Sequence, residues 1–280
     1  MNPWIGLLLS ALGALIPALL LYPFFHWLYR KSLARHPTKK LVAILLSLSL
    51  GIYSLFCAYL CFSDYVGYAM EIVLPKGEAL LLAAAFLLAA VWLSGVSKKG
   101  MDVFSLVCFA AVCGCVLLLF AFGMRHYRWE YLSSSVPKSM QGILHPIPTL
   151  LKDSLLPLLP LAAYFALTVP RRGGRMLVTG TTIGYAVLLL CILQTLLTFG
   201  AKYAAQPPYP YSFAVRVISI GPYFFRLEGF SYFTEYIACL VRTSICLALP
   251  ARLLGRFSPR FGRFLPPVAA TVIFLRYAFF

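Results

Sequence analysis

Residues 103–122 read VFSLVCFAAVCGCVLLLFAF, a run of 20 positions without a charged side chain. A helix of that length rises about 30 Å, which equals the thickness of the hydrocarbon layer of a bilayer. Inside that layer every backbone amide needs an internal hydrogen-bond partner, and a helix supplies one to each. The stretch therefore predicts a membrane-spanning α-helix, and similar stretches recur on both sides of it.

The whole chain has the composition of a membrane protein. Of its 280 residues 61% are hydrophobic and only 11% are charged, and the mean hydropathy of +0.87 excludes a water-soluble domain of this size. We predict an all-α polytopic membrane protein in which residues 1–280 form a single integral membrane domain with external loop segments at 123–154 and 200–230. About eight transmembrane helices are expected, at residues 4–28, 41–65, 79–96, 103–122, 155–169, 176–199, 231–249 and 264–280.

The formal net charge of +16 follows the loops between these helices. Lys and Arg cluster after the first, third, fifth and seventh helices, whereas most acids follow the second, fourth and sixth. Since loops rich in Lys and Arg stay in the cytoplasm, both termini are predicted to be extracytoplasmic. The same rule explains the excess of positive charge, so the lipid bilayer is the expected partner and nucleic acid is not.

The sequence offers little to soluble-type catalysis or to metal binding. Its 8 cysteines all lie inside apolar runs, which favours buried free thiols over disulfides, and its 4 histidines fall in four separate segments without ligand spacing. No phosphate-binding loop, nucleophile elbow or HExxH helix occurs. We expect no enzyme activity, no cofactor and no metal.

Small residues recur at helical spacing on two of the predicted helices. One face of helix 41–65 carries Ser47, Gly51, Ser54, Ala58 and Cys61. Another backbone can approach this face closely, or a substrate passage can be lined by its hydroxyls. Both interpretations stay open. In helix 176–199, Gly180 and Gly184 form a GxxxG motif, which predicts a packing face.

Two prolines interrupt the predicted helix 155–169 at Pro157-Leu158-Leu159-Pro160. Each proline removes an amide donor and clashes with a carbonyl four residues upstream, so the helix is expected to kink or unwind there. Transporters use broken helices at membrane depth to hold substrate, and a simple kink is the alternative.

Helix 231–249 carries two charges, Glu235 and Arg242, on nearly the same face and about 10.5 Å of rise apart. Intramembrane charges are costly and usually functional. Alternatively, Glu235 sits near the outer interface and Arg242 extends to the other side as an anchor.

The segment YPYSFAVRVISIGPYFFRLEGFSYFTEYIACLVRTSICLAL, residues 209–249, contains a family-like pattern. Pro210 precedes Arg216 and the run Ile218-Ser219-Ile220, and Arg226-Leu227-Glu228 follows. This pattern resembles the spore germination permease family, the membrane B-subunit of nutrient germinant receptors within the amino acid-polyamine-organocation transporter superfamily.

The resemblance implies a transporter fold of ten helices in inverted five-helix repeats. The eight helices predicted here align with the second through ninth, so the chain is expected to lack the first and last helices of that fold. By this alignment, helix 155–169 corresponds to a discontinuous helix, and helix 41–65 faces the pocket. The resemblance assigns structural roles to Arg216, Arg226 and Glu228.

The expected function is that of a membrane subunit of a spore germinant receptor in the spore inner membrane. It would bind a small-molecule germinant such as an amino acid and signal to a soluble-domain subunit and a lipoprotein. A secondary transporter of small solutes that uses Glu235, or a degenerate scaffold subunit without ligand binding, are the alternatives. The predicted ligand-binding residues are Ser47, Gly51, Ser54, Pro157, Leu158, Pro160, Glu235 and Arg242.

Overall fold

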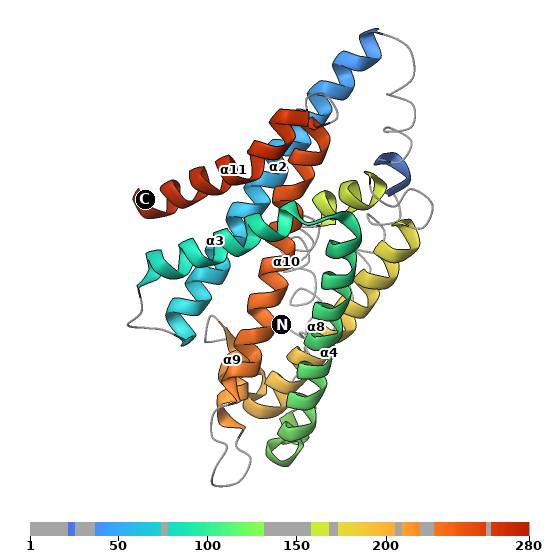
Figure 1. Cartoon of the computed structure of the whole chain (residues 1–280). Helices are drawn as coiled ribbons and strands as arrows, with labels where there is room; N and C mark the ends of the chain where they lie inside the picture. The colour runs from blue at the N-terminus through green and yellow to red at the C-terminus, as the bar shows by residue number, and fades with distance from the viewer. Residues whose placement is uncertain are drawn as a thin grey trace. The chain divides into compact units, whose positions relative to one another are not determined.

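The computed structural model of the chain describes residues 22–25, 37–73, 78–131, 158–167, 173–204, 209–218, 227–255 and 259–279. Within these ranges every regular element is a helix and no strand occurs (Figure 1), which confirms the predicted all-α class. The elements are α2 (Pro37–Tyr68), a π-helix (Ala69–Val73), α3 (Ala79–Gly95), α4 (Lys98–Gly123), a 3-10 helix (Met124–His126), α8 (Gly173–Ala204), α9 (Pro210–Val217), α10 (Glu228–Leu254) and α11 (Pro259–Phe279).

Most of the observed helices match predicted ones and extend beyond them by a few residues. Helix α3 ends one residue before the predicted end, and residues 158–167 are helical inside the predicted range 155–169. Of the predicted helix 4–28, only residues 22–25 are described, and they are helical.

The region 200–230, predicted as an external loop, contains a short helix that the sequence reading missed. Helix α9 begins at Pro210, which occupies the first helical position, where the missing N–H costs nothing. Just before this region, α8 is interrupted at Gly200, whose φ of 74° suits a residue without a side chain. There the backbone N–H of Arg128 donates to the carbonyl of Leu197 at 2.9 Å.

Four of the described helices are long and apolar enough to cross a bilayer, namely Ser47–Val73, Lys99–His126, Gly174–Gly200 and Glu228–Leu254. Two shorter apolar helices, Ala79–Gly95 and Leu158–Leu167, accompany them. The chain is thus an integral membrane protein, whereas the inverted-repeat arrangement stays a prediction.

Contacts divide the chain into two compact units. The first unit comprises residues 1–15, 107–155 and 179–237, and the second comprises residues 16–106, 156–178 and 238–280. The prediction of a single membrane domain stays a prediction, because two units can belong to one domain.

The first unit has a small apolar core around α9. Leu119 of α4 packs with Val215 and Ile218 and with Leu227, and Tyr211 packs against this cluster.

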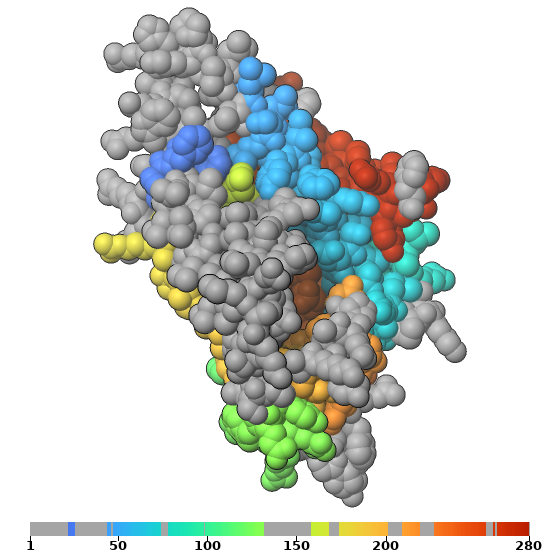
Figure 2. Space-filling model, turned by 180° about the vertical axis from the view of Figure 1, so that it is seen from behind, coloured from blue at the N-terminus to red at the C-terminus, as the bar shows by residue number. Residues whose placement is uncertain are grey.

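The second unit contains α2, α3, α11 and the C-terminal part of α10. Helices α3 and α11 pack together, and Figure 2 shows α11 beside α2 on one face of the molecule. Aromatic side chains join these helices: Phe62 of α2 contacts Phe86 of α3 and, at a centroid distance of 5.3 Å, Tyr277 of α11. Tyr65 stacks on Phe86 at 4.3 Å.

Candidate functional site

The candidate site lies in the second unit, where α2 packs closely against α10. A side chain added at Gly51 would meet the Cβ of Pro250 at 3.3 Å, so glycine permits the backbones to approach here. Gly51 and Pro250 are both buried. The small-residue face predicted on helix 41–65 is therefore a packing face at this point.

A hydrogen bond beside this contact explains how a proline can occupy the interior of α10. Pro250 has no N–H, so the carbonyl of Cys246, four residues earlier, lacks its helical donor. The hydroxyl of Ser54 donates to that carbonyl at 2.7 Å. In a bilayer a neighbouring hydroxyl is a common substitute for a helical donor, which lets α10 continue past Pro250 to Leu254.

The order of the contacts gives the relative direction of the two helices. Gly51 faces Pro250, Ser54 faces Cys246, and residues further along α2 face Arg242. Position numbers rise on α2 as they fall on α10, so the helices are antiparallel. This agrees with the charge pattern, which predicts opposite directions for these two spans.

Arg242 lies next to Val241, the central residue of α10. The nearer end of the helix, Leu254, is about 18 Å of helical rise away. An arginine side chain is much shorter than this distance, so its charge does not reach the end of α10. The alternative role of Arg242 as an interfacial anchor stays a prediction.

Several polar side chains of α2 and α10 lie within electrostatic reach of Arg242. Its charge interacts with Tyr53, Cys57 and Cys61 of α2 and with Cys246 of α10. Tyr53 and Cys57 are hydrogen-bonded to each other, and Cys57 and Cys61 are buried. We call Arg242, Tyr53, Cys57 and Cys61 the Arg242 site.

Within the described residues, the Nε atom of Arg242 is buried and has no hydrogen-bond partner. The Oγ1 atom of the neighbouring Thr243, a fully buried residue, also has none there. Arg242 as a whole is half-buried, and a buried N–H donor without an acceptor is costly. The site is therefore suited to bind an anion, and a planar carboxylate fits the fork of a guanidinium best.

The other predicted ligand-binding residues lie apart from this guanidinium or outside the described residues. Ser47 is buried on α2, Glu235 is exposed on α10, and Pro157 is not described. Leu158 and Pro160 lie in the first turn of helix 158–167, where a missing N–H leaves no helical bond unmade. The predicted break upstream of Pro160 falls outside the described residues.

Helix 158–167 contacts α10 at a position closer to the C-terminal end of α10 than the Arg242 site. The guanidinium of Arg252 lies 4.7 Å from the centre of the Tyr164 ring, which is a cation–π contact. Arg252 is ten positions, or about 15 Å of rise, from Arg242. Among the described contacts, none brings Leu158 or Pro160 to the Arg242 site.

The prediction that Gly180 and Gly184 form a packing face is wrong for the described part of the chain. Both glycines are exposed, and no described atom lies within 4 Å of a side chain added at either position. A GxxxG motif permits close packing but does not require it. By contrast, all 8 cysteines lie in described helices as free thiols, as predicted.

Two of the three family-pattern residues form an ion pair in the first unit. The Nε of Arg216 in α9 lies 3.0 Å from Oε2 of Glu228, the first residue of α10. An acidic residue at a helix N-terminus is also stabilised by the helix dipole. This pair ties α9 to α10, in agreement with the structural role that the resemblance assigned, while Arg226 lies outside the described residues.

Several residues of the site were missed by the sequence reading, although the sequence carries signals for them. Tyr53 and Cys57 precede Cys61 at spacings of four, so all three share a face of α2. Pro250 was placed after the end of the helix because proline usually marks an end. Only the position of Ser54 opposite it explains why the helix continues.

The described residues include no group of three or more His, Cys, Asp or Glu side chains that could hold a metal ion.

Comparison with known proteins identifies the family. None of the curated proteins compared with the chain matches it. A family model described as spore germination protein matches residues 1–256, a range that contains the whole Arg242 site and the ion pair of Arg216 with Glu228. The match covers most of the chain and agrees with the resemblance carried by residues 209–228. The chain therefore belongs to the spore germination protein family.

Proposed function

We propose that this protein is the membrane subunit of a spore germinant receptor, that it binds a small nutrient bearing a carboxylate, such as an amino acid, and that Arg242 binds the carboxylate. In this proposal it signals to partner subunits, a soluble-domain subunit and a lipoprotein, and does not catalyse a reaction. Its place would be the spore inner membrane. Family membership supports a role in germination, and the Arg242 site supports the choice of ligand.

The single observation that carries the proposal is the buried Nε of Arg242, which has no hydrogen-bond partner among the described residues. Its neighbours Tyr53, Cys57 and Cys61 carry hydroxyl and thiol groups and no carboxylate. An incoming carboxylate supplies both the opposite charge and the acceptors. Away from water such a charge-assisted pair is strong, because little solvent competes with it.

The position of the site also suggests how binding is transmitted. Arg242 lies in the contact between α2 and α10, and the same contact contains the bond from Ser54 to the Cys246 carbonyl. A ligand that neutralises Arg242 changes the electrostatic interactions of α10 with Cys57 and Cys61. A partner subunit would then respond to the change in the relative position of α2 and α10.

Binding measured on the purified full chain tests this proposal. Isothermal titration with a set of amino acids should identify at least one ligand, and the corresponding amino acid amide should bind at least tenfold more weakly. Arg242→Gln should weaken binding by at least tenfold, because loss of a buried charge-assisted pair costs about 2 kcal/mol or more. Arg242→Lys should retain part of the affinity.

Arg125→Gln is the matched control, since Arg125 is exposed and lies in the 3-10 helix after α4. It should bind like the wild type. Equal binding of the acid and its amide, or an unchanged affinity in Arg242→Gln, contradicts the proposal. In spores, a deletion strain that germinates normally with every nutrient would contradict the receptor role itself.

A secondary transporter is the second candidate, and the same central cation favours it, because a mid-membrane anion site suits transport as well as sensing. Uptake of the bound amino acid into proteoliposomes distinguishes the two. Uptake that depends on Arg242 supports transport, while binding without uptake supports the receptor. Assembly with partner subunits without any ligand affinity would instead identify a scaffold.

A further inference from the structure

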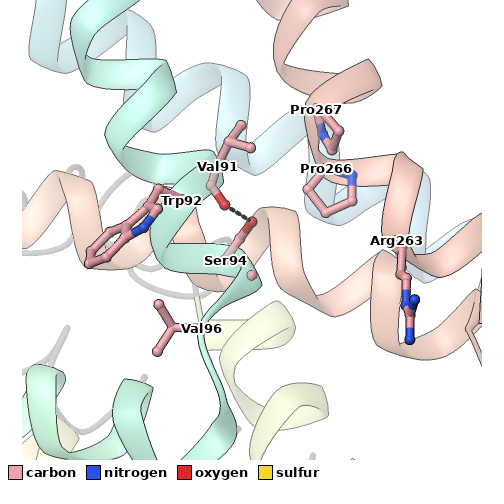
Figure 3. Close-up of a pocket in the computed structure, with 8 residues that line it drawn as sticks. Val91, Trp92, Ser94, Val96, Arg263, Pro266 and Pro267 are labelled. Atoms are coloured by element: carbon pink, nitrogen blue, oxygen red, sulfur yellow. Dashed lines mark hydrogen bonds between the residues drawn. The ribbon is translucent and has the colours of Figure 1, made fainter.

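A second candidate binding site lies between α3 and α11 in the second unit. The C-terminal end of α3 and the N-terminal part of α11 enclose an open pocket of about 380 Å³ (Figure 3). This volume is at the lower end of the range of small-molecule sites. The lining residues are Val91, Trp92, Ser94, Gly95, Val96, Arg263, Pro266 and Pro267.

Exposed basic side chains lie on the rim of the pocket and near it in the sequence. Arg263 is exposed on the rim of the pocket, and Arg260, three residues earlier on α11, is exposed as well. Lys99, three residues after Val96, is also exposed. These three cations, together with the positive end of the α11 dipole, favour an anionic occupant.

Two consecutive prolines leave backbone carbonyls of α11 free to accept hydrogen bonds near the pocket. Pro266 and Pro267 lie inside α11 and have no N–H. The carbonyls of Gly262 and Arg263, four residues earlier, therefore lack their helical donors. This stretch of α11 can thus accept hydrogen bonds from hydroxyl groups, while the guanidinium of Arg263 can donate to a phosphate.

The surroundings of the pocket are apolar and suited to acyl chains. Trp92 on α3 is 72% exposed, and its ring combines an apolar body with an N–H donor, as is typical at the edge of the hydrocarbon layer. Exposed apolar side chains continue along both helices, at Leu88 on α3 and at Phe264 and Val268 on α11. A bound molecule with a charged head and apolar tails would match this surface.

We infer that the pocket between α3 and α11 binds the headgroup of an anionic phospholipid with free hydroxyl groups, of which phosphatidylglycerol is the simplest example. The guanidinium of Arg263 binds the phosphate, the Arg263 carbonyl that Pro267 leaves without its helical donor accepts from a glycerol hydroxyl, and Trp92 and its apolar neighbours hold the acyl chains. This inference is independent of the nutrient site.

Native mass spectrometry of the full chain tests the inference. The delipidated protein is mixed with equal amounts of phosphatidylglycerol and phosphatidylcholine, and the bound lipids are counted. Wild type should retain phosphatidylglycerol preferentially. Arg263→Gln should lower this preference about fivefold, the equivalent of the roughly 1 kcal/mol that one basic residue contributes at an anionic surface.

Two further variants separate a local site from general charge. Arg263→Lys should keep most of the preference, because it keeps the charge, and it guards against loss of folding in Arg263→Gln. Arg276→Gln, an exposed arginine near the other end of the same helix, should leave the preference unchanged. An unchanged preference in Arg263→Gln, or an equal loss in Arg276→Gln, overturns the inference.

A third lipid tests the hydroxyl acceptors. Phosphatidylmethanol carries the same phosphodiester charge without free hydroxyls, so it should be retained about fivefold less than phosphatidylglycerol, as expected for loss of a hydrogen bond. Equal retention of the two lipids would overturn the role of the prolines.

Discussion

Helices α8 and α10 are similar in length and hydropathy but differ in what they contact. Their apolar spans, Gly174–Gly200 and Glu228–Leu254, both have 27 residues, and an 18-residue window within each has a mean hydropathy of 2.1 and 1.7, respectively. In the most apolar window only 6% of α8 is buried inside the protein, against 61% of α10. Hydropathy therefore identifies a span without showing whether lipid or protein surrounds it.

The polar residues explain this difference between the two helices. Helix α10 carries Arg242, Thr243 and Pro250, which protein neighbours can accommodate and lipid cannot. The exposed part of α8 carries the glycines at 180 and 184, which lipid tolerates without cost. Small residues thus marked a packing face on α2, at Gly51, but not among the described contacts of α8, at Gly180 and Gly184.

The largest expected effect comes from filling the contact between α2 and α10. Gly51→Leu places a side chain where Pro250 lies 3.3 Å from the first added atom, so overpacking should lower the free energy of unfolding by about 3 kcal/mol. Unfolding in mixed SDS and detergent micelles measures it. Gly184→Leu on α8 is the control and should change stability little. Similar losses in both variants would remove the distinction between the two helices.

The next largest effect is expected from removing the charge of Arg242, which should raise stability and abolish nutrient binding. Arg242→Leu removes a half-buried charge whose buried Nε has no described hydrogen-bond partner. Without nutrient, the free energy of unfolding of the variant should therefore be about 2 kcal/mol higher than that of the wild type. Added nutrient should stabilise the wild type and not the variant, because only the wild type binds it. A less stable variant would show that Arg242 is already paired in the protein.

A smaller loss is expected from removing the hydroxyl that supports Pro250. Ser54→Ala leaves the Cys246 carbonyl without a donor and should cost about 1 kcal/mol. In a Pro250→Ala background the carbonyl regains its helical N–H, so the same substitution should cost much less. This double-mutant cycle measures the coupling directly. Additive effects would show that the two residues act separately.

The smallest effect belongs to the ion pair in the first unit. Arg216→Gln should lower stability by less than about 1 kcal/mol, because the side chains of Arg216 and Glu228 are 34% and 32% exposed and solvent screens the pair. Glu228→Gln and the double variant complete a cycle in the same unfolding assay. A loss as large as that of Gly51→Leu would place a second tightly packed region in the first unit.

Much of the helix pattern was predictable, and the site was predictable in part. Spans such as 79–96 and 103–122 follow from uninterrupted apolar runs, and Arg242 was selected because charge at membrane depth is costly. Its neighbours Tyr53 and Cys57 were not selected, because neutral side chains in an apolar helix carry no distinctive signal. Helix α9 was missed because a short helix with polar and aromatic residues resembles a loop.

The sequence by itself determined that the chain is a bundle of membrane helices, because only a helix can satisfy a backbone within hydrocarbon. It also determined the family, through the pattern between Pro210 and Glu228. Only the tertiary structure decided that α2 packs against α10, and that Ser54 supplies the donor that Pro250 removes. Such pairings depend on side chains far apart in the chain, whose complementarity a local pattern does not contain.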